Sequence, residues 1–547
     1  MKKSLALLLA VCFLAACDMT AGESLPAAPS GDGEREKHVC GDYAYIILED
    51  GTAEIVEAAR WSEEAPDPPE ELTFPAELNG IPVTAIGEGI GRILRVGVKK
   101  VTVPEGITTL RWSSLSCSTL RTVELPRSLV SVEDGAFLSC ENLREIKLAT
   151  DHPALEYTKG MLISREDRRL IRCLPQKAGK KAVIPKGTAV IGIYAFADCR
   201  KIQSVTIPDS VTEIRHGAFH FCEGLRSVTI PGSVKAIGRE AFGQCKRLKN
   251  VKLGEGLETL GNFAFAYCDR LEKINLPRSL TSFGVNPFLG CGKLKTVTLP
   301  KDHPTLKMVK SVLFDKSGET LLWYPSRLTA KSYAIPEGTK TIAPQAFHFG
   351  KFRTVTVPDS VTEIGNYAFC ECKNLRQIDL PDSVTALGKG AFEQCERLTQ
   401  AVLTDRLTEL PESLFYCCDR LETVTLPDGI REIPEMLFMS CKAMKTLTLP
   451  DSVTVIGQRA FSWCESLESV ILPEGLREIG DYAFLACKSL PGLNIPAGVS
   501  LIGEDAFRTA RTRFERDVVP FTATVSPGSY AEQYCKDNGL TYVCAGE

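Results

Sequence analysis

Cysteine is the residue best able to do chemistry in this chain, which carries 21 of them among 547 residues. A thiolate can ligate a metal, attack an electrophile or form a disulfide, and each use needs its own spacing. Twelve of the cysteines lie three residues after a phenylalanine, and Cys117 marks a degenerate earlier copy of that arrangement. A cysteine that recurs at a fixed distance from a phenylalanine indicates a repeated sequence unit, and the equivalent cysteines of the units form a column. The column consists of Cys117, Cys140, Cys199, Cys222, Cys245, Cys268, Cys291, Cys372, Cys395, Cys418, Cys441, Cys464 and Cys487.

This column predicts packing rather than disulfide or metal chemistry. Stacked rungs lie about 5 Å apart, a spacing at which two Cα atoms could be bridged. Identical positions in a stack point their Cβ atoms in parallel, however, whereas a disulfide needs them to converge. We therefore expect buried thiols that behave as small hydrophobes among Phe and Leu side chains. Among the six cysteines outside the column and the amino end, Cys535 and Cys544 are the pair that most favours a disulfide.

Other reactive residue types give no stronger signal. His216 and His220 have the i, i+4 spacing of a helical zinc site, but no third ligand follows, so we expect exposed rung histidines. Gly87, Gly89 and Gly91 lack the strand-to-helix context of a phosphate loop and fit turns. Because no catalytic triad, carboxylate pair or nucleotide loop stands out, we expect no enzyme, cofactor or small-molecule substrate. The net charge of −4 and the 44% hydrophobic content argue against nucleic-acid binding and disorder.

The amino end predicts export and lipid anchoring. Two lysines precede an apolar run over residues 5–14, which is too short for a permanent membrane span. Two alanines before Cys17 resemble the lipobox of bacterial lipoproteins, with an ordinary signal peptide as the alternative. We expect residues 1–17 to be the signal peptide, Cys17 the lipid anchor, and 18–40 a flexible tether rich in Ala, Gly, Pro, Ser and Glu. Asp18 resembles an inner-membrane retention signal, so the cell surface, the outer membrane and the inner membrane all stay open.

A repeat of 23 residues organises most of the chain. Fourteen units carry the phenylalanine, and proline stands eleven positions before it in twelve of them. Within one unit, Leu225, Val228 and Ile230 have the spacing of a short strand, and Pro231 ends that strand because it cannot donate to a ladder. No such unit buries its apolar face alone, so the units must stack. We expect a repeat solenoid of 23-residue rungs, mostly β, with one parallel β-sheet face.

Two intervals break the period, and both open with Asp-His-Pro. Each contains two apolar runs around a polar turn, which predicts β-hairpin insertions near residues 151–181 and 302–332 that cover or brace the stack. Residues 41–75 predict a further β-hairpin that caps the first rung. The array itself spans residues 76–518, and residues 519–547 form a C-terminal cap in which a Ser-x-x-Glu capping box predicts a short helix.

The pattern Leu-x-x-Val-x-Ile-Pro, Ile-Gly, Ala-Phe, Cys, found between Leu225 and Cys245, resembles the BspA-like, treponemal-type leucine-rich repeats. The resemblance covers most of residues 76–510 and implies a leucine-rich-repeat superhelix. It also implies a bacterial surface protein without catalytic activity, which binds macromolecules of a host or of a neighbouring cell. Extracellular-matrix proteins are the usual association of such repeats. Since members differ widely in their partners, the resemblance gives a class of activity and leaves the ligand open.

The expected sheet presents two exposed columns that could bind an adhesin-type ligand. We expect them to steer acidic proteins or polyanionic glycans, with a soluble, non-sticky sheet and solvated charges as the alternative. The alternative from a different functional class is a structural component of the cell envelope that associates with itself. The predicted hydroxyl face comprises Thr206, Thr229, Thr298, Thr356, Thr425 and Thr448. The predicted basic rim comprises Arg121, Arg144, Arg226, Lys249, Lys295, Arg353, Arg376 and Lys445.

Overall fold

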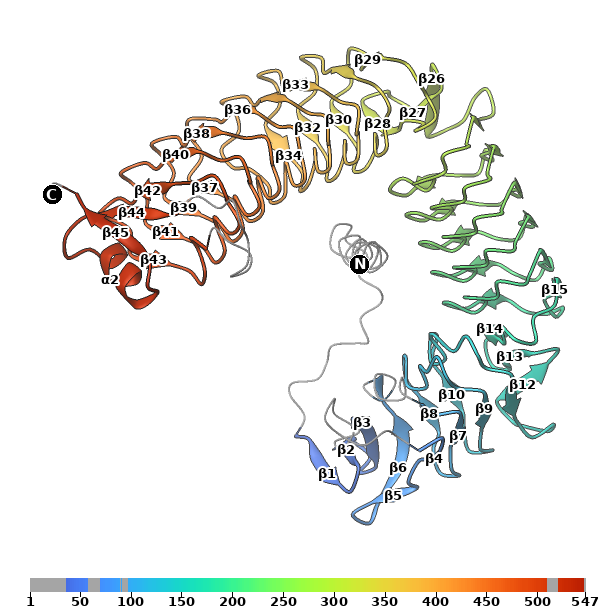
Figure 1. Ribbon diagram of the computed structural model, residues 1–547. Helices are drawn as coiled ribbons and strands as arrows, with labels where there is room; N and C mark the ends of the chain where they lie inside the picture. Colours follow the sequence, from blue (N-terminus) through green and yellow to red (C-terminus); the bar gives the residue numbers. More distant parts are fainter. Residues whose placement is uncertain (1–35, 58–68, 89, 91–96, 509–519, 546–547) are drawn as a thin grey trace. The chain divides into compact units, whose positions relative to one another are not determined.

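Two compact units make up the computed structural model, residues 1–302 (unit 1) and residues 303–547 (unit 2). The structure describes residues 36–57, 69–88, 90, 97–508 and 520–545. The predicted signal peptide, its Cys17 and most of the predicted tether lie outside the described residues. In each unit the strands of successive rungs lie side by side, as the solenoid prediction requires (Figure 1).

A typical rung contains two strands. In one rung the chain leaves β19 (Ser227–Thr229), turns after Pro231, forms β20 (Ala236–Ile237) and returns through a run of turns to β21 (Asn250–Lys252). β19 pairs in parallel with β21, and β20 pairs in parallel with β22 (Thr259–Leu260) of the next rung. We call the first kind main strands and the second kind short strands. The β-solenoid with a parallel main-strand face is confirmed, and the short strands add a second parallel ladder that the sequence did not predict.

Each face of unit 1 is built from two successive sheets. The main strands are β4 (Glu71–Thr73), β7 (Lys100–Thr102), β9 (Thr122–Glu124) and β11 (Glu145–Lys147), then β15 (Lys181–Val183), β17 (Ser204–Thr206), β19, β21, β23 (Lys273–Asn275) and β25 (Thr296–Thr298). The short-strand ladders contain β6 (Ile81–Ile86), β8 (Thr109–Leu110) and β10 (Ser131–Val132), then β16 (Val190–Ile191), β18 (Glu213–Ile214), β20, β22 and β24 (Ser282–Phe283). β5 (Glu77–Leu78) pairs antiparallel with β6. Since β4 already pairs as a main strand with β7, the array begins inside the predicted cap 41–75.

The rungs of unit 2 follow the same plan. Its main strands are β29 (Ser332–Ala334), β31 (Thr354–Thr356), β33 (Gln377–Asp379), β35 (Gln400–Val402), β36 (Thr423–Thr425), β38 (Thr446–Thr448), β40 (Ser469–Ile471) and β42 (Gly492–Asn494). Its short strands are β30 (Thr341–Ile342), β32 (Glu363–Ile364), β34 (Ala386–Leu387), β37 (Glu432–Ile433), β39 (Val455–Ile456), β41 (Glu478–Ile479) and β43 (Leu501–Ile502).

The predicted cap and both predicted insertions are one supersecondary unit used three times. Each is a three-stranded antiparallel meander rather than a two-stranded hairpin, and its last strand pairs in parallel with the next short strand. The meanders therefore begin new short-strand ladders and brace the stack. Since β1 lies within the predicted tether 18–40, that prediction is wrong for its last three residues. The meanders are β1 (His38–Cys40), β2 (Tyr43–Ile47) and β3 (Ala53–Glu57); β12 (Leu155–Thr158), β13 (Met161–Ser164) and β14 (Arg169–Cys173); and β26 (Leu306–Val309), β27 (Val312–Asp315) and β28 (Thr320–Trp323).

The core is a stack of phenylalanine rings lined by thiols. Neighbouring rings of the column lie in offset stacks, with centroids 4.8–6.3 Å apart and planes within 22° of parallel. All thirteen column cysteines are buried, which confirms the predicted packing role. In ten of them the Sγ–H group donates to the carbonyl oxygen of the preceding rung's phenylalanine at 3.1–3.3 Å, as from Cys245 to Phe219.

The carboxyl end closes the core of unit 2 as predicted. Ser529 caps helix α2 (Tyr530–Asp537) by accepting a hydrogen bond from the Glu532 N–H at 3.2 Å. Glu532 in turn accepts from the backbone N–H of Gly528 at 2.7 Å. The helix lies between β44 (Thr522–Val525) and β45 (Thr541–Cys544), which extend the last main-strand sheet in parallel. Cys535 is a buried free thiol, so the disulfide with Cys544 that the spacing favoured is not formed.

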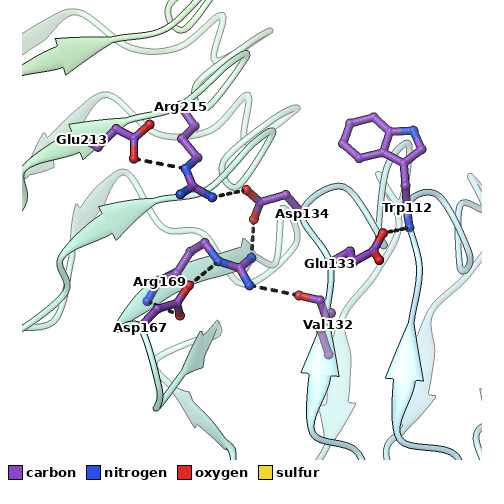
Figure 2. A network of polar contacts seen from close by, with 8 residues as sticks. All are labelled: Trp112, Val132, Glu133, Asp134, Asp167, Arg169, Glu213 and Arg215. Atoms are coloured by element: carbon purple, nitrogen blue, oxygen red, sulfur yellow. Dashed lines mark hydrogen bonds and ion pairs between the residues drawn. The ribbon is translucent and has the colours of Figure 1, made fainter. Parts of the chain in front are cut away.

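A network of buried charges crosses the gap between the first two short-strand ladders of unit 1 (Figure 2). Asp134 follows β10 and accepts from both Arg169 on β14 and Arg215 after β18, the latter at 2.9 Å. Arg169 also donates to the carbonyl oxygen of Val132 in β10 at 3.2 Å, where no ladder partner continues the strand. The side chains of Asp134 and Arg169 are only 9% and 13% exposed. A Cβ atom at Gly192 would lie 2.6 Å from Asp134 Oδ1, so this glycine makes room for the carboxylate.

Replacing Cys245 by alanine tests the contribution of the thiol column to stability. The variant loses the hydrogen bond to Phe219 and leaves a cavity beside the ring stack, so we expect the free energy of unfolding to fall by about 1 to 2 kcal/mol. Urea unfolding of residues 36–547 measures this change. Cys40→Ala is the matched control, because Cys40 is only half-buried and lies outside the column. Equal effects of the two substitutions would contradict the assignment.

Asp134→Asn tests the charged network. The substitution removes the more buried of the two carboxylates that pair with the guanidinium of Arg169 and leaves Asp167, whose side chain is 47% exposed, so we expect a loss of about 2 to 3 kcal/mol in the free energy of unfolding. Glu213→Gln serves as the control, because Glu213 pairs with the same Arg215 at 3.2 Å but its side chain is 41% exposed. The control should cost less than about 1 kcal/mol. Chemical denaturation of both variants decides the point, and a larger loss for Glu213→Gln would refute it.

Candidate binding surface

The main-strand face carries the predicted hydroxyl column on its exposed side. In β17 and β19 the middle residue points into the core, whereas Thr206 and Thr229 are exposed. Thr298, Thr356, Thr425 and Thr448 hold the same position on other main strands and are exposed as well. The register breaks the column, because Thr229 lies opposite Lys252. The structure therefore gives short patches of hydroxyl groups rather than a continuous ladder.

The predicted basic rim lies one residue before each main strand, and all eight of its side chains are exposed. In most rungs this residue's backbone N–H donates to the carbonyl of the equivalent residue in the preceding rung, as from Lys249 to Arg226 at 2.9 Å. The rim brings together three adjacent basic pairs but no continuous stripe, because Glu272 separates Lys249 from Lys295 and Glu468 pairs with Lys445 at 3.5 Å. The three pairs are Arg121 with Arg144, Arg226 with Lys249, and Arg353 with Arg376.

A groove in unit 1 brings together four basic side chains. It has a volume of about 520 Å³, and its lining consists of Arg226, Arg247, Lys249, Asn250 and Arg270. Lys249 pairs with Glu272 at 3.4 Å, whereas the three arginines form no ion pair with any residue that the structure describes. Three uncompensated guanidinium groups at one opening make a strongly positive local potential. The groove is therefore a candidate site for an anionic ligand.

Two of the groove residues were missed by the sequence analysis. Arg247 and Arg270 each lie two residues after a column cysteine, at Cys245 and Cys268. The rim prediction considered only the position directly before the strand, so it did not reveal this second basic column. A comparison of charge at every position of the 23-residue unit would have found it, since Lys293 continues the column in the following rung.

The corresponding position of unit 2 carries less charge. Arg353 and Arg376 correspond to Arg226 and Lys249, but Asn374 stands where Arg247 would be. The Asn374 side chain accepts a hydrogen bond from Arg397 at 3.4 Å. A second groove, of about 710 Å³, opens on the short-strand side of unit 2 and has the opposite charge. Its acidic lining residues are Glu409, Glu412, Glu432, Glu435, Glu478 and Asp481.

Each histidine of the i, i+4 pair has a side-chain partner of its own. His216 accepts or donates a hydrogen bond with the Tyr194 hydroxyl at 2.7 Å, and His220 lies 3.6 Å from Glu240. Burial lowers the pKa of His220, although Glu240 partly opposes the shift. The prediction of exposed histidines is therefore wrong, because both rings pack between rungs. Among the described residues no group of three His, Cys, Asp or Glu side chains is arranged to hold a metal ion.

The glycines Gly87, Gly89 and Gly91 give no phosphate loop within the described residues. Gly87 donates its backbone N–H to the carbonyl of Ile55 at 2.7 Å, and an added Cβ would lie 2.8 Å from that oxygen. The position thus needs glycine for close packing of two rungs. Gly89 and Gly91 lie outside the described residues.

Unit 2 buries an unusual carboxyl group. Burial raises the pKa of Glu393 to about 7, the Gln394 side chain lowers it by donating at 3.2 Å, and the nearby carboxylate of Glu371 raises it further. The pKa of Glu371 is itself lowered, because His348 and Lys373 outweigh the effect of its burial. These groups lie on successive rungs at the positions just after the column phenylalanine. Their arrangement affects stability rather than forming an open pocket.

The sequence of the repeats matches a known family model. The family model of the BspA type leucine rich repeat region matches six copies, over residues 94–158, 180–319, 324–445 and 431–516. These ranges make up more than half of the chain, and the first gap between them falls in the meander β12–β14. No curated protein matches the chain.

Solved structures of similar repeats come from several bacteria. A leucine-rich repeat protein from Bacteroides ovatus is 29% identical, covers 71% of this chain and 97% of its own, and has a TM-score of 0.42. One from Eubacterium ventriosum is 21% identical over 66% of this chain and 95% of its own, with a TM-score of 0.46. A leucine rich cell surface protein from Faecalibacterium prausnitzii is 24% identical over 88% of this chain and 99% of its own, with a TM-score of 0.38.

Glu393→Gln tests the buried carboxyl group. A folded-state pKa near 7 lies above the ordinary value of 4.5, so neutral Glu393 stabilises the fold below pH 4.5 and this stabilisation is lost as the pH rises to 7. We expect the wild type to lose about 2 to 3 kcal/mol of unfolding free energy relative to Glu393→Gln over that range. Urea unfolding at several pH values measures the difference. Glu396→Gln, an exposed control on the same rung, should show no such change, and a flat profile for Glu393→Gln against wild type would contradict the assignment.

Proposed function

Because the chain belongs to the BspA type leucine-rich repeat family, we propose that it is a cell-surface lipoprotein that binds macromolecules of a host or of a neighbouring cell. Binding takes place on the main-strand face and its basic rim. The observation that carries the proposal is the unit 1 groove, where three exposed arginines lie together without a carboxylate partner among the described residues. Charges left unpaired on a rigid surface favour an acidic partner and speed its encounter.

The non-catalytic part of the proposal is supported by the way the reactive groups are used. The column thiols donate to backbone carbonyls, and burial raises the pKa of eleven of them, to about 12 for Cys140 and Cys464. A thiol held in its protonated form is a poor nucleophile. Glu393 is likewise enclosed between rungs, with only Gln394 donating to it among the described side chains.

The anchoring part of the proposal rests on the amino-terminal sequence. Lipidation of Cys17 would attach the chain to a membrane, and the tether that follows would hold the rungs away from the bilayer. None of the helices that the structure describes has the length and apolar character needed to span a membrane. An extracellular position suits a binding surface made of exposed cations and hydroxyl groups. The membrane that holds the anchor depends on whether Asp18 acts as an inner-membrane retention signal.

The test is binding of the soluble region 36–547 to immobilised matrix proteins and to host-cell surfaces at low and high salt. Screening weakens exposed ion pairs, so we expect the affinity to fall roughly tenfold between about 50 and 300 mM salt. The double substitution of Arg226→Glu and Arg353→Glu should weaken binding at low salt. An affinity indifferent to both salt and charge reversal would refute the proposal. Concentration-dependent assembly in light scattering, without matrix binding, would favour the self-associating envelope component instead.

A further inference from the structure

We propose that the unit 1 groove lined by Arg226, Arg247, Lys249, Asn250 and Arg270 binds a sulfated polysaccharide that lies across successive rungs. The inference rests on the proposed function and names the ligand class for one site of the binding surface. It is drawn from the composition of the groove, from the spacing of its cations and from the donor chemistry of arginine.

The groove lacks the aromatic anchors of a protein interface. Protein partners are held mainly by tryptophan, tyrosine and arginine side chains that enter well-packed pockets. The groove lining contains four cationic residues and one amide, and no aromatic or apolar side chain. Single-stranded nucleic acid would likewise need aromatic side chains on which bases can stack. A highly charged and hydrophilic polymer is the ligand class that such a lining can hold.

The spacing of the cations matches a linear ligand. Three successive rungs contribute: Arg226 from the first, Arg247 and Lys249 from the second, and Arg270 from the third. The backbone hydrogen bond from Lys249 to Arg226, at 2.9 Å, fixes neighbouring rungs in register. Parallel strands lie about 4.8 Å apart, so the cations repeat at that interval along the stack. A chain whose anionic groups recur at short distances can contact all three rungs at once, and a rigid array costs little ordering on binding.

The chemistry of the side chains favours sulfate groups. A guanidinium presents a planar fork of donors that binds two oxygens of one oxyanion and is more weakly hydrated than an ammonium. Three of the four cations in the groove are arginines. Ser227 and Thr229 are exposed on the adjoining main strand and, with Asn250, offer hydrogen bonds to sugar hydroxyl groups. A carboxylate can bind the same fork, so the choice of a sulfated chain rests on the short spacing of its charges together with the arginine donors.

Unit 2 supplies a control surface on the same backbone plan. Arg353 and Arg376 form an adjacent rim pair there, but Asn374 replaces the second-column arginine and already accepts a hydrogen bond from Arg397 at 3.4 Å. The second basic column resumes there only at Arg397, the counterpart of Arg270, and its guanidinium donates to Asn374, so this surface should bind a sulfated chain more weakly than the groove. Comparison of the two units therefore separates the groove from exposed charge in general.

The experiment measures binding of a heparin-type dodecasaccharide to the soluble region 36–547 by isothermal titration calorimetry. Replacing Arg247 and Arg270 by glutamate should lower the affinity about tenfold or more. The double variant of Arg353→Glu and Arg376→Glu carries the same change in net charge and should alter the affinity less than about threefold. All four arginines are exposed, so circular dichroism should show both variants folded like the wild type.

Further probes decide between ligand classes. The same dodecasaccharide without its sulfates, a polyglutamate of matched charge and a single-stranded oligonucleotide should each bind the wild type at least about tenfold more weakly. Equal or tighter binding of polyglutamate would overturn the inference in favour of an acidic protein, and equal binding of the oligonucleotide would overturn it in favour of nucleic acid. Equal losses in the two double variants would also overturn it. Absence of heparin binding together with salt-sensitive matrix binding would refute the inference while the proposed function stands.

Discussion

The carbonyl oxygens of ten column phenylalanines tie one rung to the next. In Phe219 this oxygen accepts the backbone N–H of Cys222 at 3.1 Å and the Cys245 thiol of the following rung at 3.3 Å. The N–H of Phe219 donates to Ala241 of that rung at 2.7 Å, and its ring stacks on Phe242 at 5.0 Å. Because the same contacts recur along each unit, successive rungs superpose. A column of the sequence thereby becomes a row of neighbouring side chains in space.

This constraint separates two kinds of position. Buried columns must keep the size and polarity that the ring stack allows, since a cavity or an unpaired polar group there destabilises two rungs at once. Exposed columns meet no such demand, and neighbouring rungs can carry different charges at one position. Arg247 in unit 1, which is exposed, and Asn374 in unit 2, which is half-buried, occupy equivalent positions on the same backbone plan. The binding properties of a face therefore depend on the residues in a few exposed columns. Those residues can differ while the fold stays the same.

Much of the fold was predictable because its main signals are local and repeated. The phenylalanine, cysteine and proline columns indicated the solenoid, and the Ser529 and Glu532 pair indicated the terminal helix. Short strands of two residues have no periodicity of their own, so the second ladder was missed. Turn residues were equally hidden, because many left-handed positions are held by side chains such as Tyr194 and Trp463 and only some by glycine. The network around Asp134 joins residues up to 81 positions apart, a separation that no local pattern records.

The site was predictable in part for the same reason. The register of the main strands places Arg226 beside Lys249, as the rim column indicated, and Glu272 beside Lys249 on the other side. Arg247 and Arg270 belong to a different column of the repeat, which lies next to the rim only in the folded protein. The most direct measurement is a crystal structure of residues 36–547 with a sulfated oligosaccharide. Stacking in register predicts the sugar chain across the rungs of unit 1, with sulfate oxygens at hydrogen-bond distance from Arg226, Arg247 and Arg270. A sugar chain bound along a single rung, or away from this groove, would contradict the account.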